Sequence, residues 1–175
     1  YDTHRPRPRN PMPITVRDAT ESDLPRILEI LNEAIANTTA VWSWTPLDLA
    51  NRQAWLAARR QRGFPVLVVT DDSGVLGYAS YGPFRDWDGY AQTVEHSVYI
   101  DVAARGRGLG RSLLRSLIAR AQEAGLHVMI GGIDASNAVS IRLHESLGFV
   151  ETARMPQVGR KFDRWLDLVF LQKLL

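Results

Sequence analysis

A glycine-rich hexapeptide constrains this chain more than any other feature of its sequence. The hexapeptide is Arg105-Gly-Arg-Gly-Leu-Gly110; a predicted strand over 93–102 precedes it, and apolar residues recur at helical spacing after it. Glycines let a ligand approach the backbone closely, and the free N–H groups and dipole of a helix N-terminus favour an anion such as pyrophosphate. The segment is neither a P-loop nor a dinucleotide-binding fingerprint, because the required Gly-Lys-Ser/Thr and the glycine pattern after the first strand are absent. It is therefore either an anion site or a tight turn closed by glycines.

The rest of the chain reads as one α/β domain over 12–175. Helical periodicity predicts helices from Thr20 to Ile35, from Thr45 to about Gly63, from the glycine loop to Gly125, and over 137–147. β-branched and apolar runs predict strands over 14–17, 66–70, 75–81, 93–102, 128–132, 149–153 and 165–174. This order favours a mixed, mostly antiparallel central sheet flanked by helices. Residues 1–11 are polar and proline-rich, so we expect a disordered tail or an expression-derived extension there.

Composition excludes several classes of function. The 175 residues include no cysteine, which rules out disulfides, thiolate metal sites and a cysteine nucleophile, and we expect no metal. Without Arg5, Arg7, Arg9 and Asp2, the 21 basic and 19 acidic residues become 18 and 18, so we expect no nucleic-acid partner. No apolar run is long enough to span a bilayer and no signal-peptide pattern is present. We therefore expect a cytoplasmic protein without a membrane partner.

Two motifs together resemble those of the GNAT acetyltransferases. The first is Arg-x-x-Gly-x-Gly at 105–110, and the second is the helix from Asn137 to Phe149, with its Ser140, His144 and Gly148-Phe149. The resemblance covers nearly all of 14–174 and implies a GNAT fold with acetyl-CoA as co-substrate. It implies that acetyl-CoA binds to Val98, Tyr99, Ile100, Arg105, Gly106, Arg107, Gly108, Leu109, Gly110, Arg111 and Asn137.

Within that family the chain is most similar to the phosphinothricin and methionine sulfoximine/sulfone acetyltransferases. The similarity lies in Thr93-Val-Glu-His-Ser-Val-Tyr-Ile100, Leu143-His-Glu145 and the stretch from Met155 to Asp167. It implies transfer of acetyl to the α-amine of a small amino-acid analogue, namely methionine sulfoximine, methionine sulfone or phosphinothricin. The biological effect would be detoxification. Relatives often form dimers, so a homodimer is consistent with the resemblance.

The resemblance also implies roles for individual side chains. Glu95 corresponds to the strand glutamate that acts as general base, directly or through water, although a structural acid in an ion pair would show the same pattern. His144 is expected near the sulfur, either as the acid that protonates the departing thiolate or as a pantetheine contact; a helix-surface histidine is the alternative. The expected substrate-lining residues are Arg85, Asp86, Trp87, Glu95, His96 and Ser97.

Some of these assignments have alternatives in the sequence itself. His96 follows Glu95 directly, so on a regular strand it points to the opposite face, where it would be a core histidine unless a bulge reorients it. Lys161, in the late loop, is expected at the surface, with a contact to the substrate as the alternative. The reaction itself has two alternatives, acetylation of another primary amine (a peptide N-terminus, a polyamine or an antibiotic) and a non-catalytic acyl-CoA sensor.

Overall fold

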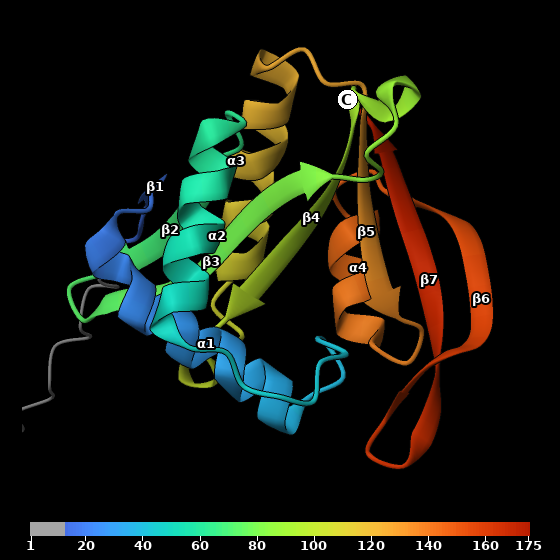
Figure 1. The fold of residues 1–175 in the computed structure, drawn as a ribbon, viewed down its shortest axis with the longest axis horizontal. Helices are drawn as coiled ribbons and strands as arrows, with labels where there is room; N and C mark the ends of the chain where they lie inside the picture. The colour runs from blue at the N-terminus through green and yellow to red at the C-terminus, as the bar shows by residue number, and fades with distance from the viewer. Residues whose placement is uncertain (1–12) are drawn as a thin grey trace, which may run out of the picture.

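The computed structural model describes residues 13–175, whose centre is a seven-stranded sheet (Figure 1). The strands are β1 (Thr15–Asp18), β2 (Val66–Asp71), β3 (Gly74–Pro83), β4 (Thr93–Ile100), β5 (Val128–Asp134), β6 (Val150–Lys161) and β7 (Arg164–Leu174). They lie in the order β1-β2-β3-β4-β5-β7-β6, and every neighbouring pair is antiparallel except β4 and β5. The expected tail over 1–11 lies outside the described residues.

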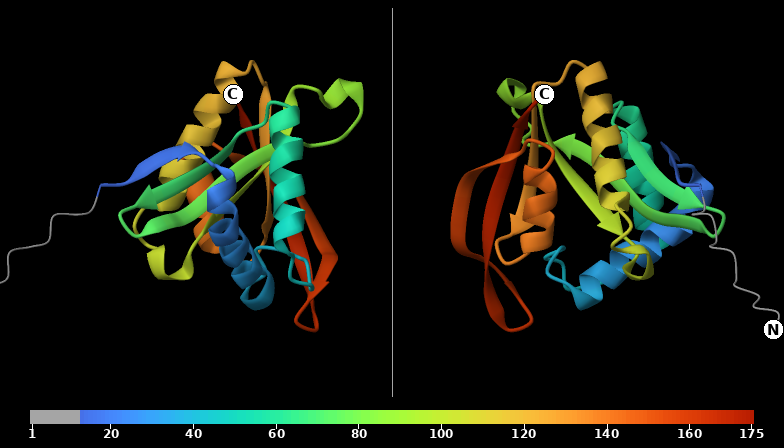
Figure 2. Two further views of the ribbon diagram at one scale, coloured as in Figure 1. Left: turned by 60° about the vertical axis from the view of Figure 1, so that its left-hand side comes forward. Right: turned by 180° about the vertical axis from the view of Figure 1, so that it is seen from behind.

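Helices cover both faces of the sheet, as the views in Figure 2 show. The helices are α1 (Leu24–Asn37), α2 (Leu49–Gln61), α3 (Leu109–Glu123) and α4 (Ala138–Glu145). α1 and α2 pack on one face, over a cluster that includes the buried side chains of Ile27, Leu56 and Val68. α3 packs on the other, against a larger cluster that includes Leu113 and Met129. None of the helices in 13–175 is both long and apolar enough to cross a membrane.

A gap between β4 and β5 is the feature of the sheet that matters most for function. The two parallel strands pair only from Thr93–Val128 to Glu95–Ile130 and then diverge (Figure 1), whereas β4 stays paired with β3 up to Ile100. The N–H of Asp101 donates to Leu76 O of β3. Because N–H directions alternate along a strand, the N–H groups of Val98 and Ile100 point into the gap.

The predicted number and order of helices and strands are confirmed, but two boundaries were wrong. α2 begins at Leu49 and not at Thr45, because the Asp48 side chain accepts a hydrogen bond from Asn51 N and caps the helix there. β6 continues to Lys161 instead of ending at 153. Its register with β7 shifts at two irregularities, which absorb the polar residues that had indicated a loop.

Candidate active site

The glycine loop joins β4 to α3 in a conformation that requires glycine. Gly106 and Gly108 have φ angles of 78° and 75°, and Gly108 is the residue that precedes α3. A Cβ atom at either position would meet nothing within 4 Å, so the backbone angle and not crowding demands glycine there. The first turn of α3 contains no acidic residue, and the N–H groups of a first helical turn have no partners within the helix. The loop therefore fits a pyrophosphate.

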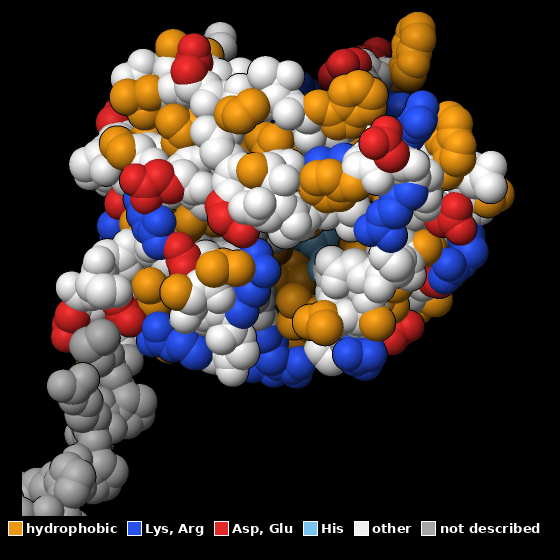
Figure 3. All heavy atoms as spheres, turned by 90° about the horizontal axis from the view of Figure 1, so that it is seen from below, with side chains coloured by type: hydrophobic (Ala, Val, Ile, Leu, Met, Phe, Trp, Pro, Cys, Tyr) orange, Lys and Arg blue, Asp and Glu red, His pale blue; other side chains and the backbone are white. Residues whose placement is uncertain are grey.

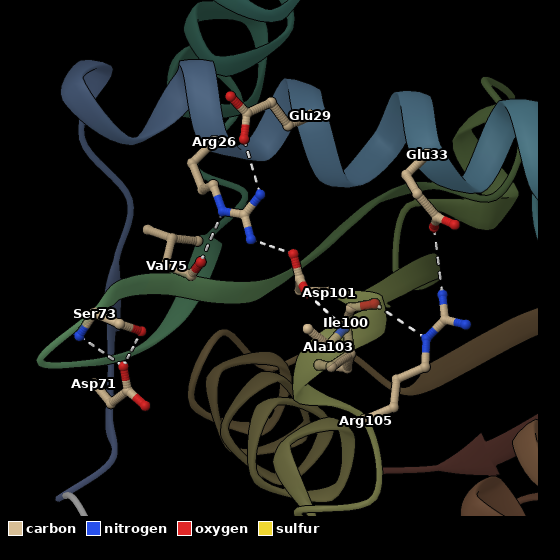
Figure 4. A network of polar contacts seen from close by, with 10 residues as sticks. All are labelled: Arg26, Glu29, Glu33, Asp71, Ser73, Val75, Ile100, Asp101, Ala103 and Arg105. Carbon is tan, nitrogen blue, oxygen red and sulfur yellow. Dashed lines mark hydrogen bonds and ion pairs between the residues drawn. The ribbon is translucent and has the colours of Figure 1, made fainter.

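Three arginines surround this loop and each is held by a protein group. Arg105 lies 3.5 Å from Glu33 and donates to Ile100 O (Figure 4), while Arg107 lies 3.1 Å from Asp71. Arg111 donates to Ser146 Oγ at 2.6 Å. Arg105 and Arg107 are thus paired with carboxylates, whereas Arg111 is held by a neutral hydroxyl.

The junction before the loop is fixed by a further ion pair. Arg26 of α1 contacts Asp101, whose carboxylate also accepts the N–H of Ala103 at 2.7 Å (Figure 4). Arg26 donates in addition to Val75 O of β3. At α4, the Asn137 side chain accepts from Ser140 N at 3.1 Å and caps that helix. These bonds hold the loop and α4 on either side of the gap between β4 and β5.

Glu95 lies on β4 where that strand last pairs with β5. Its side chain is half-buried, on the face of the sheet that α1 and α2 cover, and its Oε1 would be 3.1 Å from a Cβ added at Gly132. Among residues 13–175 its carboxylate has no hydrogen bond or ion pair, so the alternative of a salt-bridged structural acid is not what the structure shows. Burial raises the pKa of Glu95, and the charge of Arg85 partly opposes that shift. A carboxylate with a raised pKa suits a general base.

His96 and His144 form a buried pair on the opposite face of β4, because the strand has no bulge at this point. Their Nε2 atoms are 2.8 Å apart. His96 Nδ1 lies 2.9 Å from Ile130 O, and His144 Nδ1 lies 2.7 Å from Ser140 O. Gly131 makes room for the pair, since a Cβ there would be only 2.7 Å from His96 Cε1.

The hydrogen bonds of this pair require one proton more than two neutral imidazoles carry. Carbonyl oxygens only accept, so both Nδ1 atoms must be donors, and each neutral ring then has a bare Nε2. A hydrogen bond between the two Nε2 atoms needs a third proton. Burial and the neighbouring His144 lower the pKa of His96 to about 3, and burial lowers the pKa of His144. At neutral pH both rings are therefore mainly neutral, and only a small fraction of molecules carries the third proton.

The remaining predicted substrate residues lie on the side of Glu95. Arg85, Asp86 and Trp87 are exposed in the loop between β3 and β4, where the Arg85 guanidinium stacks 5.0 Å from the Phe84 ring. Ser97 is exposed on the same face of β4 as Glu95, and it lines a cavity described below. Seen from below, the molecule is hollowed and a histidine side chain is visible inside the hollow (Figure 3).

Two features of the site were not predicted from the sequence. Lys161, expected at the surface, is buried, and its ammonium group donates to Ile35 O, Thr38 O and Val41 O at 2.6 Å each. Arg52 and Arg59 of α2 face the cavity on the Glu95 side of the sheet. No motif marks either feature; the seven-residue spacing of the two arginines is the one signal that could have placed them on a common helix face.

A glycine loop at a helix N-terminus, a gap in the sheet with N–H groups directed into it, and a carboxylate without an ion pair among residues 13–175 are features that suit an acyl-transfer enzyme. Residues 25–149 match the model of the acetyltransferase (GNAT) family. The chain is 57% identical to the L-methionine sulfoximine/L-methionine sulfone acetyltransferase of Pseudomonas paraeruginosa, over 92% of this chain and 94% of that protein. It is 50% identical to the L-amino acid N-acyltransferase MnaT of Escherichia coli, over 91% and 92%.

A solved structure gives the same result in three dimensions. The phosphinothricin acetyltransferase of Sinorhizobium meliloti, in complex with acetyl-CoA, superposes with a TM-score of 0.90 at 37% identity, over 93% of this chain and 88% of that one. The chain belongs to the GNAT acetyltransferase family, and it is an N-acetyltransferase.

Proposed function

We propose that this enzyme transfers the acetyl group of acetyl-CoA to the α-amine of small amino-acid analogues, namely methionine sulfoximine, methionine sulfone and phosphinothricin. The names of the similar enzymes support this substrate class. The observation that carries the proposal is Glu95, a half-buried carboxylate with a raised pKa and no ion pair among the described residues, next to the point where β4 leaves β5. A sensor would have no use for such a group.

Glu95 is the base that acts on the amine of the substrate. An ammonium group cannot attack a thioester, so a base must first remove a proton. The Glu95 carboxylate accepts that proton on the α1–α2 face of the sheet, and the free amine attacks directly. The exposed loop with Arg85, Asp86 and Trp87 lies at the same edge and lines the rest of the substrate site.

The gap between β4 and β5 is the site for the acetyl donor, acetyl-CoA. Acetyl-CoA supplies an activated acyl thioester, with its pyrophosphate at the glycine loop and its pantetheine arm beside Asn137. The N–H groups of Val98 and Ile100, which point into the gap, donate to the oxygen on which negative charge develops. Because these donors belong to a strand fixed by β3, they need no rearrangement during the reaction.

His144 completes the proton balance by protonating the departing sulfur. The proton that Glu95 removes from the amine reaches Nε2 of the neutral His144 through solvent, and His144 transfers it to the sulfur. Because burial lowers the pKa of His144, the imidazolium formed in this step is a strong acid.

The test is release of free thiol from acetyl-CoA with five amines: methionine sulfoximine, methionine sulfone, phosphinothricin, a polyamine and a short peptide. We expect turnover with the three amino-acid analogues. Turnover with only the peptide or the polyamine would assign a different substrate, and no turnover with any of the five would favour an acyl-CoA sensor.

A further inference from the structure

A cavity of about 230 Å³ lies between α1, α2 and the sheet, on the face that carries Glu95. Ser97 and Tyr99, which follow Glu95 at alternate positions of β4, line it from the sheet. Arg52, Trp55 and Arg59 line it from α2. The three α2 residues are spaced by three and four, so they share one face of the helix.

The two arginines bring positive charge into this cavity without an acidic partner. Both are half-buried, and within the described part of the chain neither forms an ion pair. Arg52 donates to the neutral Asn51 side chain, and its guanidinium lies 4.6 Å from the centre of the Trp55 ring. Arg59 Nε is buried and has no hydrogen-bond partner in the described structure. Buried charges are normally paired, so this arrangement lacks an anion.

The position of Arg59 ties the cavity to the reacting centre. Its guanidinium lies over Gly82, where any Cβ atom would collide with it. Gly82 is directly opposite Glu95 in the β3–β4 pairing. Residues opposite each other in an antiparallel pair share a face and have Cβ positions about 5 Å apart. Arg59 therefore occupies the space beside Glu95 on the same face of the sheet.

We propose that Arg52 and Arg59 bind the α-carboxylate of the amino-acid substrate. The inference rests on the proposed function, because it assumes that Glu95 receives the α-amine. The amine and the carboxylate of an α-amino acid are attached to one carbon atom, so a site with the amine at Glu95 holds the carboxylate a few ångströms away. The carboxylate is also the anion that all three analogues share, since a sulfone carries no net charge. Arg85 is the weaker candidate, because it is exposed and a carboxylate there would remain hydrated.

The test compares methionine sulfone with its α-carboxamide, which keeps the amine and removes the charge. Arg59→Met and Arg52→Met keep much of the side-chain length without the guanidinium. Arg115→Met is the control, because Arg115 is exposed on α3, which covers the other face of the sheet. We expect the ratio of kcat/KM for the acid to that for the amide to fall about 10- to 100-fold in the first two variants, from the loss of charge-assisted hydrogen bonds. The ratio should be unchanged in Arg115→Met.

Three results would overturn the proposal. Equal losses for acid and amide in Arg59→Met would assign Arg59 to the distal end of the substrate or to folding alone. A change of the ratio in Arg85→Met, with none in Arg52→Met and Arg59→Met, would place the carboxylate in the loop. Wild-type enzyme that turns over other amines but neither sulfone compound would refute the proposed function, and the carboxylate site with it. The melting temperature and acetyl-CoA affinity of each variant show whether the protein is folded. Arg59→Lys keeps the charge but not the forked guanidinium, so it should lower the acid-to-amide ratio less than Arg59→Met does.

Discussion

Replacing Lys161 by methionine removes a single cation that joins three parts of the fold. The ammonium group donates to Ile35 O near the end of α1, to Thr38 O at its C-cap and to Val41 O in the following loop. Lys161 itself is the last residue of β6. Two of the three carbonyls lie at a helix C-terminus, where backbone oxygens lack partners and a cation is favourable. Methionine fills similar volume but leaves all three oxygens without this donor.

The cost follows from those contacts. A hydrogen bond to a charged group contributes about 1.5–3 kcal/mol, but burial of the ammonium group, which lowers the pKa of Lys161, offsets part of the sum. We expect a net loss of about 3 kcal/mol in the free energy of unfolding. For a domain of this size that corresponds to a fall in Tm of about 6–12 °C. The KM for the amine should also rise, because the loop after α1 contributes Val41 and Ser43 to the cavity.

Thermal unfolding followed by circular dichroism measures the effect. Lys173→Met is the matched control, because the Lys173 side chain makes no hydrogen bond within residues 13–175 and is only half-buried. A Tm for Lys161→Met within about 1–2 °C of the control would show that the three contacts contribute little, and the reasoning on buried charge would be refuted.

Three further changes test the donor site and the histidine pair. Gly108→Glu should abolish acetyl-CoA binding in a calorimetric titration, because it places a negative charge at the anion site and a side chain at φ 75°; unaltered affinity would exclude the loop. Gly131→Ala crowds His96 and should lower stability by about 1–3 kcal/mol and reduce turnover, whereas Gly89→Ala, where a Cβ meets nothing within 4 Å, should do neither; equal Tm values for the two variants would contradict the crowding. His144→Phe should lower kcat about 100-fold without loss of acetyl-CoA affinity, with His127→Phe as the control; unchanged kcat would remove the acid role.

Local patterns were enough to predict the order of helices and strands and the position of the glycine loop. Apolar spacing placed α3, and Gly108 followed by an amphipathic segment indicated its N-terminus. The start of α2 was missed because Thr45-Pro46 and Asp48 are both acceptable helix starts, and the choice was made by the hydrogen bond from Asn51 to Asp48. Irregular pairing with β7 made a strand of a polar segment that has no strand pattern of its own.

Contacts between distant segments could not be read from the sequence. The alternation of a regular strand predicted that His96 points away from Glu95, but not that it meets His144, which is 48 residues further along the chain. The role proposed for Arg52 and Arg59 likewise depends on the packing of α2 over β3, which brings Arg59 above Gly82. Lys161 looked like a surface residue because its three acceptors are backbone atoms, which leave no mark in a sequence.

The most direct test of the central claim is the pH dependence of kcat/KM for methionine sulfone in the wild type and in Glu95→Gln. Burial raises the pKa of Glu95, so the base is protonated at low pH and wild-type activity should rise through a pKa above the ordinary value for glutamate. Because the pKa of Glu95 is raised in the folded state, ionisation of this residue destabilises the fold as pH rises above the unfolded-state pKa. Glu95→Gln should therefore be at least as stable as the wild type at neutral pH. We expect the variant to lose about 10²- to 10⁴-fold in rate, together with that acidic limb, while it keeps its Tm and acetyl-CoA affinity. A variant with wild-type activity and an unchanged pH profile would show that Glu95 is not the base.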